Sequence, residues 1–232
     1  MTRGRDIFAV VPVKGTIEAK SRLSPDYPVE FRRALARAML EDVLAALGAV
    51  KELAGVIVVT VDALARATAE RFGARVFEDG ARDGHTGAVV AAGRRLAIEG
   101  RAGMLTVPGD IPLITADEVS RLFAAHGEAP AFSIVPAHDR RGSNAILMTP
   151  PDAVPLAFGN DSFLPHLDAA RRLGLEPAIV PLPGIGLDID NGPDLALLMQ
   201  RPSPTHTWAL LAARGLVAPW SRGGGASTKG RP

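Results

Sequence analysis

The chain has 232 residues, of which 47% are hydrophobic, and its 26 lysines and arginines stand against 25 aspartates and glutamates. This length allows a sizeable core, and the formal net charge of +1 predicts no long-range attraction to nucleic acid or to an anionic membrane. The absence of cysteine excludes disulfides, thiolate metal sites and a cysteine nucleophile. The first apolar run, broken by Pro12 and Lys14, is too short for a signal peptide or a membrane span, so we expect a cytoplasmic protein.

Strand-like and helix-like segments alternate along the chain. Short apolar runs predict strands at residues 7–13, 56–60, 75–77, 104–107, 132–136 and 145–148. Amphipathic patterns predict helices at residues 28–47, 63–72, 87–98, 116–125, 163–173 and 194–199. The alternation favours one α/β domain whose mainly parallel, mixed sheet carries helices on both faces, with ligands at the carboxyl ends of the strands. Two small domains would also fit the length.

The pattern weakens towards the C-terminus. Residues 1–200 are expected to form the main domain, and residues 201–232 a C-terminal extension. Within the extension, one short amphipathic segment near residues 208–216 predicts a helix. The last dozen residues are rich in glycine and are expected to form a flexible tail.

A basic loop follows the first predicted strand. Residues 12–23 read PVKGTIEAKSRL and bring Lys14, Lys20 and Arg22 into one loop. Clustered cations suit a triphosphate, because they neutralise the charge that builds on a departing pyrophosphate. A solvated loop before a helix is an equally ordinary explanation. The segment is not a Walker P-loop, since GxxxxGK[ST] is absent from the chain.

Carboxylates follow two further apolar segments. Residues 107–113 read VPGDIPL and place Asp110 on a turn stiffened by prolines, where it suits Mg²⁺ or caps the helix after Thr115. Residues 186–195 read GLDIDNGPDL. If this segment is extended, Asp188 and Asp190 point to one side, and two parallel carboxylates indicate a cation between them. Asp190 or Asn191 could instead cap the next helix.

Two polar turns lie between these acidic segments. Residues 140–144 read RRGSN and residues 158–162 read FGNDS, and both could bind an anion through backbone N–H groups and a hydroxyl. Each is equally consistent with a plain turn. The histidines show no metal-ligand spacing and are interpreted as surface or core residues, not as catalysts.

Taken together, the motifs PVKxxxxAKSRL, VPGDIPL, FGxxS and DIDxxxDL resemble one family over residues 6–199. That family is the 2-phospho-L-lactate/phosphoenolpyruvate guanylyltransferases of coenzyme F-420 biosynthesis. The resemblance implies a single-domain, Rossmann-like fold of the nucleotide-diphospho-sugar-transferase type, with GTP as donor and a three-carbon phospho-acid as acceptor. Phosphoenolpyruvate is favoured as the acceptor, with 2-phospholactate and 3-phosphoglycerate as alternatives. A homodimer is allowed, although the sequence does not determine the oligomeric state.

The resemblance also implies roles for individual residues. The metal, Mg²⁺, would be held by Asp110, Asp188 and Asp190. The catalytic residues would be Lys20, Arg22 and Asp110. The nucleotide would be bound by Pro12, Val13, Lys14, Lys20, Thr86, Gly87, Pro108, Gly109 and Asp110. The acceptor would be bound by Ser143, Gly159 and Ser162. One departure is that His85, Thr86, Gly87 and Ala88 stand where the family usually reads LNxA at the start of a helix in the nucleotide pocket.

Other functions remain open from the residues alone. A nucleotidyltransferase acting on a sugar phosphate or a molybdopterin-type acceptor would use the same fold. A glycosyltransferase could use the aspartates to hold a nucleotide-sugar, although the basic loop suits a triphosphate better. A nucleotide-binding protein without activity is the third alternative.

Overall fold

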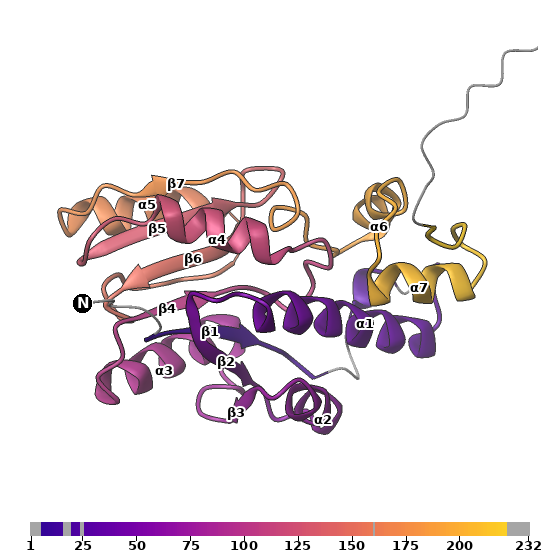
Figure 1. The fold of residues 1–232 in the computed structure, drawn as a ribbon, viewed down its shortest axis with the longest axis horizontal. Helices are drawn as coiled ribbons and strands as arrows, with labels where there is room; N and C mark the ends of the chain where they lie inside the picture. The colour runs from indigo at the N-terminus through magenta and orange to yellow at the C-terminus, as the bar shows by residue number, and fades with distance from the viewer. Residues whose placement is uncertain (1–5, 16–19, 24–25, 160, 222–232) are drawn as a thin grey trace, which may run out of the picture.

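The structure, a computed structural model, describes residues 6–15, 20–23, 26–159 and 161–221. Its strands form one seven-stranded sheet in the order β3-β2-β1-β4-β6-β5-β7 (Figure 1). The strands are β1 (Ile7–Pro12), β2 (Leu53–Val59), β3 (Arg75–Phe77), β4 (Gly103–Thr106), β5 (Ala131–Pro136), β6 (Ser143–Thr149) and β7 (Ala178–Ile179). The helices are η2 (Ser21–Leu23), α1 (Val29–Gly48), α2 (Ala63–Arg71), α3 (Gly84–Ile98), α4 (Ala116–Ala125), α5 (Phe163–Arg172), α6 (Gly192–Leu198) and α7 (His206–Ala213).

The sheet is mixed and mainly parallel, as predicted. Strand β1 pairs in parallel with β2 and β4, and β2 pairs in parallel with β3. Strand β6 runs antiparallel to both β4 and β5, while β5 pairs in parallel with β7. The two-residue strand β7 was not predicted, because so short a segment carries no periodicity. The other predicted strands and helices are present, and their ends shift by at most three residues.

Helices cover both faces of the sheet because successive residues of each strand point to opposite sides. Along β1, Ala9 and Val11 belong to a core that also contains buried residues of α1, α2 and α4. Phe8 and Val10 belong to a second core that contains buried residues of α3 and α5. The single-domain α/β layout is therefore confirmed.

A third, smaller core joins distant parts of the chain. Leu23 of η2, Ile189 and Leu211 of α7 belong to the same buried cluster, and α7 lies beside α1 in Figure 1. Asp42 of α1 anchors α7, since its carboxylate accepts hydrogen bonds from the backbone N–H groups of His206 and Thr207. The predicted helix of the extension is present and packs on the main body. The boundary at residue 200 stays a prediction, and the predicted flexible tail from residue 222 lies outside the described residues.

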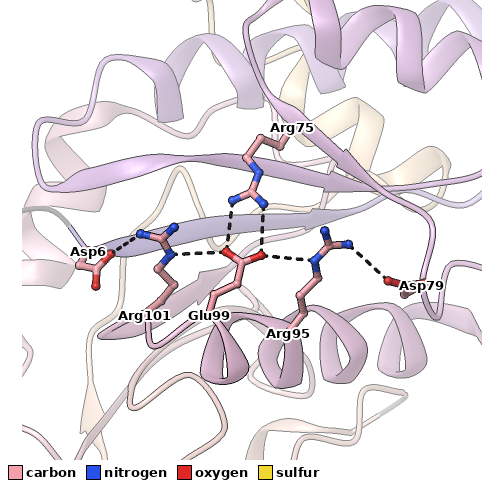
Figure 2. A network of polar contacts seen from close by, with 6 residues as sticks. All are labelled: Asp6, Arg75, Asp79, Arg95, Glu99 and Arg101. Atoms are coloured by element: carbon pink, nitrogen blue, oxygen red, sulfur yellow. Dashed lines mark hydrogen bonds and ion pairs between the residues drawn. The ribbon is translucent and has the colours of Figure 1, made fainter.

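A network of charged side chains fastens the end of α3 to the neighbouring strands. Glu99 accepts hydrogen bonds from Arg75, Arg95 and Arg101 (Figure 2). Two of these arginines reach outward to further carboxylates, Arg101 to Asp6 and Arg95 to Asp79. The three arginines of this network are therefore balanced by three carboxylates. Within the described residues, no helix is long and apolar enough to cross a membrane.

Candidate active site

A cleft of about 1020 Å³ opens at the carboxyl ends of the parallel strands. The wall of the cleft contains Pro12, the last residue of β1, and Val59, the last residue of β2. The turn after β4 contributes Asp110. The predicted site residues that line the cleft are Pro12, Val13, Lys14, Lys20, Arg22, Thr86, Pro108, Gly109, Asp110, Ser143, Gly159, Ser162, Asp188 and Asp190. Gly87 is the one predicted residue that does not line it. The fold thus brings motifs from both ends of the chain into a single cavity.

Lys20 is the centre of the charged cluster in this cleft. Its ammonium donates to a carboxylate oxygen of Asp110 and, at 3.0 Å, to Oδ1 of Asp190. Arg22 donates to the other oxygen of Asp190 at 3.4 Å. Lys20 adopts a left-handed backbone conformation with φ of 55°, which is uncommon for a residue with a side chain. Lys20 of the basic loop therefore faces the acidic turns, while Lys14 and most of the Arg22 side chain are exposed to solvent.

The ionic states in the cluster depend on one another. Burial would lower the pKa of Lys20, but the charges of Asp110 and Asp190 outweigh it and raise that pKa. Burial would raise the pKa of Asp190, but the nearby cations Lys20, Arg22 and Lys14 hold it below its usual value. The cluster therefore keeps a protonated Lys20 against the ionised carboxylate of Asp190 at neutral pH.

Asp188 lies on the same side of the cleft but is held differently. Asn144, next to Ser143 on β6, donates from one amide nitrogen to Oδ1 of Asp188 and to the carbonyl of Ile185, both at 3.0 Å. Burial raises the pKa of Asp188, and the charges of Asp110 and Asp190 raise it further against the effect of the Asn144 hydrogen bond. The charges of Asp110 and Asp190 therefore disfavour ionisation of Asp188, and a bound cation would relieve this repulsion.

Of the helix-cap roles that the sequence left open, the structure confirms the one for Asn191 and excludes those for Asp110 and Asp190. Thr115 caps α4 through its own side chain, which accepts from the N–H of Glu118. Asn191 caps α6 in a reciprocal capping box with Asp194. Neither Asp110 nor Asp190 is used as a cap. As expected for alternating positions, Leu187 and Ile189 are buried, although this segment is irregular and not a strand.

The donors in this cleft would suit a magnesium ion only together with the phosphates of a nucleotide. Among the residues that the structure describes, no group of three or more His, Cys, Asp or Glu side chains is arranged to hold a metal ion by itself. Mg²⁺ in phosphoryl-transfer sites commonly takes one or two carboxylates and completes its shell with phosphate oxygens and water. Carboxylates that repel one another beside a triphosphate-sized cleft match that mode of binding.

The two predicted acceptor loops meet at a pair of hydroxyl groups. Ser162, which precedes α5, donates from Oγ to Oγ of Ser143 at 3.3 Å. Arg141 and Asp161 join the same two loops by an exposed ion pair of 2.5 Å. Gly159 contributes an open stretch of wall, since a Cβ there would meet no atom within 4 Å.

Thr86 lines the cleft, whereas Gly87 lies behind its wall. The hydroxyl of Thr86 accepts from the N–H of Phe158 at 2.9 Å and donates to the Phe158 carbonyl, so it fastens α3 to the FGNDS turn. Gly87 lies against Asp83 and Gly80, where a Cβ would come within 2.3 Å of the Asp83 Cβ. Gly87 therefore permits the close approach of the turn before α3, and Thr86 joins two walls of the cleft.

Three contributors to the site were missed from the sequence. Asn144 was noted only as part of a polar turn, yet it orients Asp188. His85 lines the cleft and packs against Phe158 with ring centroids 4.3 Å apart, and burial lowers its pKa to about 4. His166 is buried beneath Ser143 and bonds to it. No sequence spacing indicated these contacts, because each one joins separate elements.

The fold is of the nucleotide-diphospho-sugar-transferase type. A crystal structure of a protein assigned to that class from Desulfovibrio desulfuricans G20 superposes with a TM-score of 0.73 at 20% identity, over 91% of this chain and 96% of that one. A 4-diphosphocytidyl-2C-methyl-D-erythritol synthase superposes with a TM-score of 0.58 at 16% identity, over 84% and 97% of the two chains. At these identities the likeness establishes the fold.

The chain belongs to the family described as guanylyl transferase CofC like, whose profile matches residues 7–227. It is 40% identical over 195 residues to the phosphoenolpyruvate guanylyltransferase of Rubrobacter xylanophilus, covering 83% of this chain and 93% of that protein. It is 32% identical to the 3-phospho-D-glycerate guanylyltransferase of Colwellia psychrerythraea, over 84% and 92% of the two chains. The predicted family and the nucleotidyltransferase class of enzyme are confirmed. The match also extends beyond residue 199, where the sequence resemblance ended.

Proposed function

We propose that the protein transfers GMP from GTP to the phosphate of a three-carbon phospho-acid and releases pyrophosphate. The observation that carries the proposal is the cleft in which Lys20 bonds Asp110 and Asp190, because such a site suits the triphosphate of a donor nucleotide and the chain belongs to a guanylyl transferase family. The hydroxyl pair of Ser143 and Ser162 opens into the same cleft and suits an anionic acceptor.

In the proposed reaction, an oxygen of the acceptor phosphate forms a bond to the α-phosphorus of GTP. The bond from that phosphorus to the bridging oxygen of the β-phosphate breaks, and its electron pair leaves with pyrophosphate. A phosphate monoester with a second pKa near 6 is mostly dianionic at neutral pH, so no general base is required. The cleft must instead overcome repulsion between two polyanions, which requires fixed positive charge.

Lys14, Lys20 and Arg22 supply that charge along one wall of the cleft. We assign them to the triphosphate, with Lys20 nearest the reacting phosphorus because it also bonds Asp110. Mg²⁺ would be held by Asp110, Asp188 and Asp190 together with phosphate oxygens, and when bound it would stabilise charge on the phosphates. Asn144 orients Asp188 for this role through its hydrogen bond.

Phosphoenolpyruvate is the proposed acceptor. Support comes from relatives named phosphoenolpyruvate guanylyltransferase at 40% and 38% identity, against 32% for the 3-phospho-D-glycerate guanylyltransferase. The family context further supports a place in coenzyme F-420 biosynthesis, and a cytoplasmic location stays a prediction. The three candidate acids differ by small groups, so one or two contacts in the acceptor pocket decide among them.

Pyrophosphate release tests the proposal. The purified protein with Mg²⁺ is given each of the four nucleoside triphosphates in combination with phosphoenolpyruvate, 2-phospholactate or 3-phosphoglycerate. We expect release with GTP and phosphoenolpyruvate. Release with CTP, or with a sugar phosphate and none of the acids, would instead favour a related nucleotidyltransferase. GTP binding without release in any combination would favour a protein without activity.

A further inference from the structure

His166 lies below the acceptor loops and both nitrogens of its ring are engaged. Its side chain is 1% exposed and does not line the cleft. Nδ1 is 2.9 Å from Oγ of Ser143, and Nε2 accepts a hydrogen bond from the backbone N–H of Ala157 at 3.0 Å. Phe158 packs against the ring with centroids 5.0 Å apart. The ring is therefore held in one orientation from three sides.

The hydrogen-bond partners fix where the proton of this imidazole resides. A backbone N–H can only donate, so Nε2 must carry a lone pair towards Ala157. Burial, with a smaller contribution from His85, lowers the pKa of His166 to about 4, so the ring is neutral at pH 7. A neutral imidazole has one proton, which must then be on Nδ1. Nδ1–H consequently donates to Oγ of Ser143.

The hydrogen-bond partners of Ser143 also determine the direction of its hydroxyl group. Its oxygen accepts from His166 and, at 3.3 Å, from Oγ of Ser162. A hydroxyl oxygen has two lone pairs and one hydrogen, so both lone pairs are engaged. Only the hydrogen is left to address a ligand, and Ser143 lines the cleft.

We infer that His166 is a positioning residue that makes Ser143 an obligate hydrogen-bond donor and so selects an anionic oxygen of the acceptor. The inference rests on the proposed function, since it concerns the acid that occupies this pocket. A carboxylate or phosphate oxygen can accept from Ser143, whereas an ammonium or amide N–H would meet no lone pair there. His166 itself touches no substrate, because Ser143 separates it from the cleft.

Two variants of His166 separate its two hydrogen bonds. In His166→Asn the amide nitrogen takes the place of Nδ1 and can still donate to Ser143, whereas the contact to Ala157 is lost. In His166→Gln the longer side chain reaches the place of Nε2 and can accept from Ala157, whereas the donor to Ser143 is lost. Both variants remove the ring, so loss of packing affects both.

The expected result is a split between the two substrates. We expect His166→Gln to raise KM for phosphoenolpyruvate about tenfold, the size of one net hydrogen bond, and to leave KM for GTP unchanged. His166→Asn should keep KM for phosphoenolpyruvate within about threefold of the unchanged protein. Adding His166→Gln to Ser143→Ala should cause no further rise, because the effect acts through Ser143. Equal KM values in the Asn and Gln variants would overturn the inference.

A second measurement does not depend on turnover. Nitrogen-15 NMR of the histidine-labelled protein reports which ring nitrogen carries the proton, with His166→Asn used to assign the signal. We expect the Nδ1–H form at pH 7, whereas an Nε2–H or a doubly protonated ring would overturn the inference. If the unchanged protein released no pyrophosphate with any acid, the proposed function would fail, while the observed tautomer would still decide the role of His166.

Discussion

Lys20 and Asp190 stand 170 positions apart in the chain, yet Nζ of Lys20 donates to Oδ1 of Asp190 at 3.0 Å. The same ammonium also donates to Asp110, so segments from the beginning, middle and end of the chain meet on one positive charge. The Lys20 side chain is only 10% exposed. In such a sheltered position a fixed cation stabilises developing negative charge more strongly than it would in bulk water.

Replacement of Lys20 tests this relationship directly. We expect Lys20→Met to lower kcat about 100-fold or more, the loss typical of removing one fixed group that stabilises the transition state. Steady-state kinetics with GTP and phosphoenolpyruvate measure the effect. The exposed Lys51→Met is the matched control and should retain the unchanged rate. A normal kcat/KM for GTP in Lys20→Met would refute the assignment of Lys20 to the triphosphate.

Asp188 is expected to act through Mg²⁺. Asp188→Asn keeps the size of the side chain but removes the charge, so we expect turnover to fall at least 100-fold and the Mg²⁺ concentration for half-maximal rate to rise. Titration of Mg²⁺ in the pyrophosphate assay measures both effects. Chelation of Mg²⁺ with EDTA should abolish the activity of the protein that carries no substitution. Asp168→Asn, at an exposed position of α5, is the control. An unaltered Mg²⁺ dependence in Asp188→Asn would exclude its metal role.

Gly87 and Gly159 are predicted to tolerate a methyl group differently. In Gly87→Ala the new Cβ would lie 2.3 Å from the Cβ of Asp83, so the turn before α3 must move. We expect a loss of about 1–3 kcal/mol of stability, as for other overpacked sites, and a higher KM for GTP. Gly159→Ala meets no atom within 4 Å and should keep its stability while raising KM for the acid. Thermal unfolding and kinetics check both; equal stability of the two variants would contradict this account.

The buried carboxylate of Asp42 is expected to hold the C-terminal helix in place. It is 6% exposed and accepts from the N–H of His206 at 2.6 Å and from the N–H and hydroxyl of Thr207 at 3.0 and 2.6 Å. Asp42→Asn turns an amide NH₂ towards these donors, so we expect a loss of about 1–3 kcal/mol of stability. Urea unfolding measures it, with the exposed Asp152→Asn as control. Unchanged stability would mean that α7 is held by its apolar contacts alone.

We expect the folded protein to lose stability in mild acid because of His126. Its ring bonds Ser133 and Thr149, and burial lowers its pKa to about 4. The unfolded histidine has a pKa near 6.5, so below that pH the unfolded chain takes up a proton that the folded chain does not, and stability falls as the pH drops towards 4. Because the ring is partly exposed, we expect roughly 1 kcal/mol between pH 7 and pH 5.

Urea unfolding of the unchanged protein and of His126→Gln at both pH values isolates this contribution. The variant should be less stable at pH 7 but should lose less stability on acidification than the unchanged protein. His85, which is half-buried, and His166, which is buried, also have lowered pKa values and remain in both proteins, so their contribution cancels in the comparison. Equal losses in the two proteins would contradict the prediction.

The elements of the fold could be predicted because hydrophobic periodicity is a local property of the chain. The apolar spacing of α1 and the run of β1 are visible in the sequence, and so is the alternation that buries Leu187 and Ile189 beside Asp188 and Asp190. The family motifs also named most of the charged residues that meet in the cleft, since each motif lies within one continuous segment. By itself, the sequence therefore determined the fold class, the family and the charged loops.

The tertiary structure alone decided which side chains meet. The antiparallel strand β6 places Asn144 beside Asp188 and Ser143 beside His166. Thr115 caps α4, so the carboxylate of Asp110 is available to bond Lys20. Helix α7 packs so that Thr207 bonds the carboxylate of Asp42. None of these pairs has a characteristic spacing, because their separation in the chain is set by connecting helices and loops. Contacts between distant segments depend on how the whole sheet packs with its helices, and this packing cannot be predicted from a local sequence pattern.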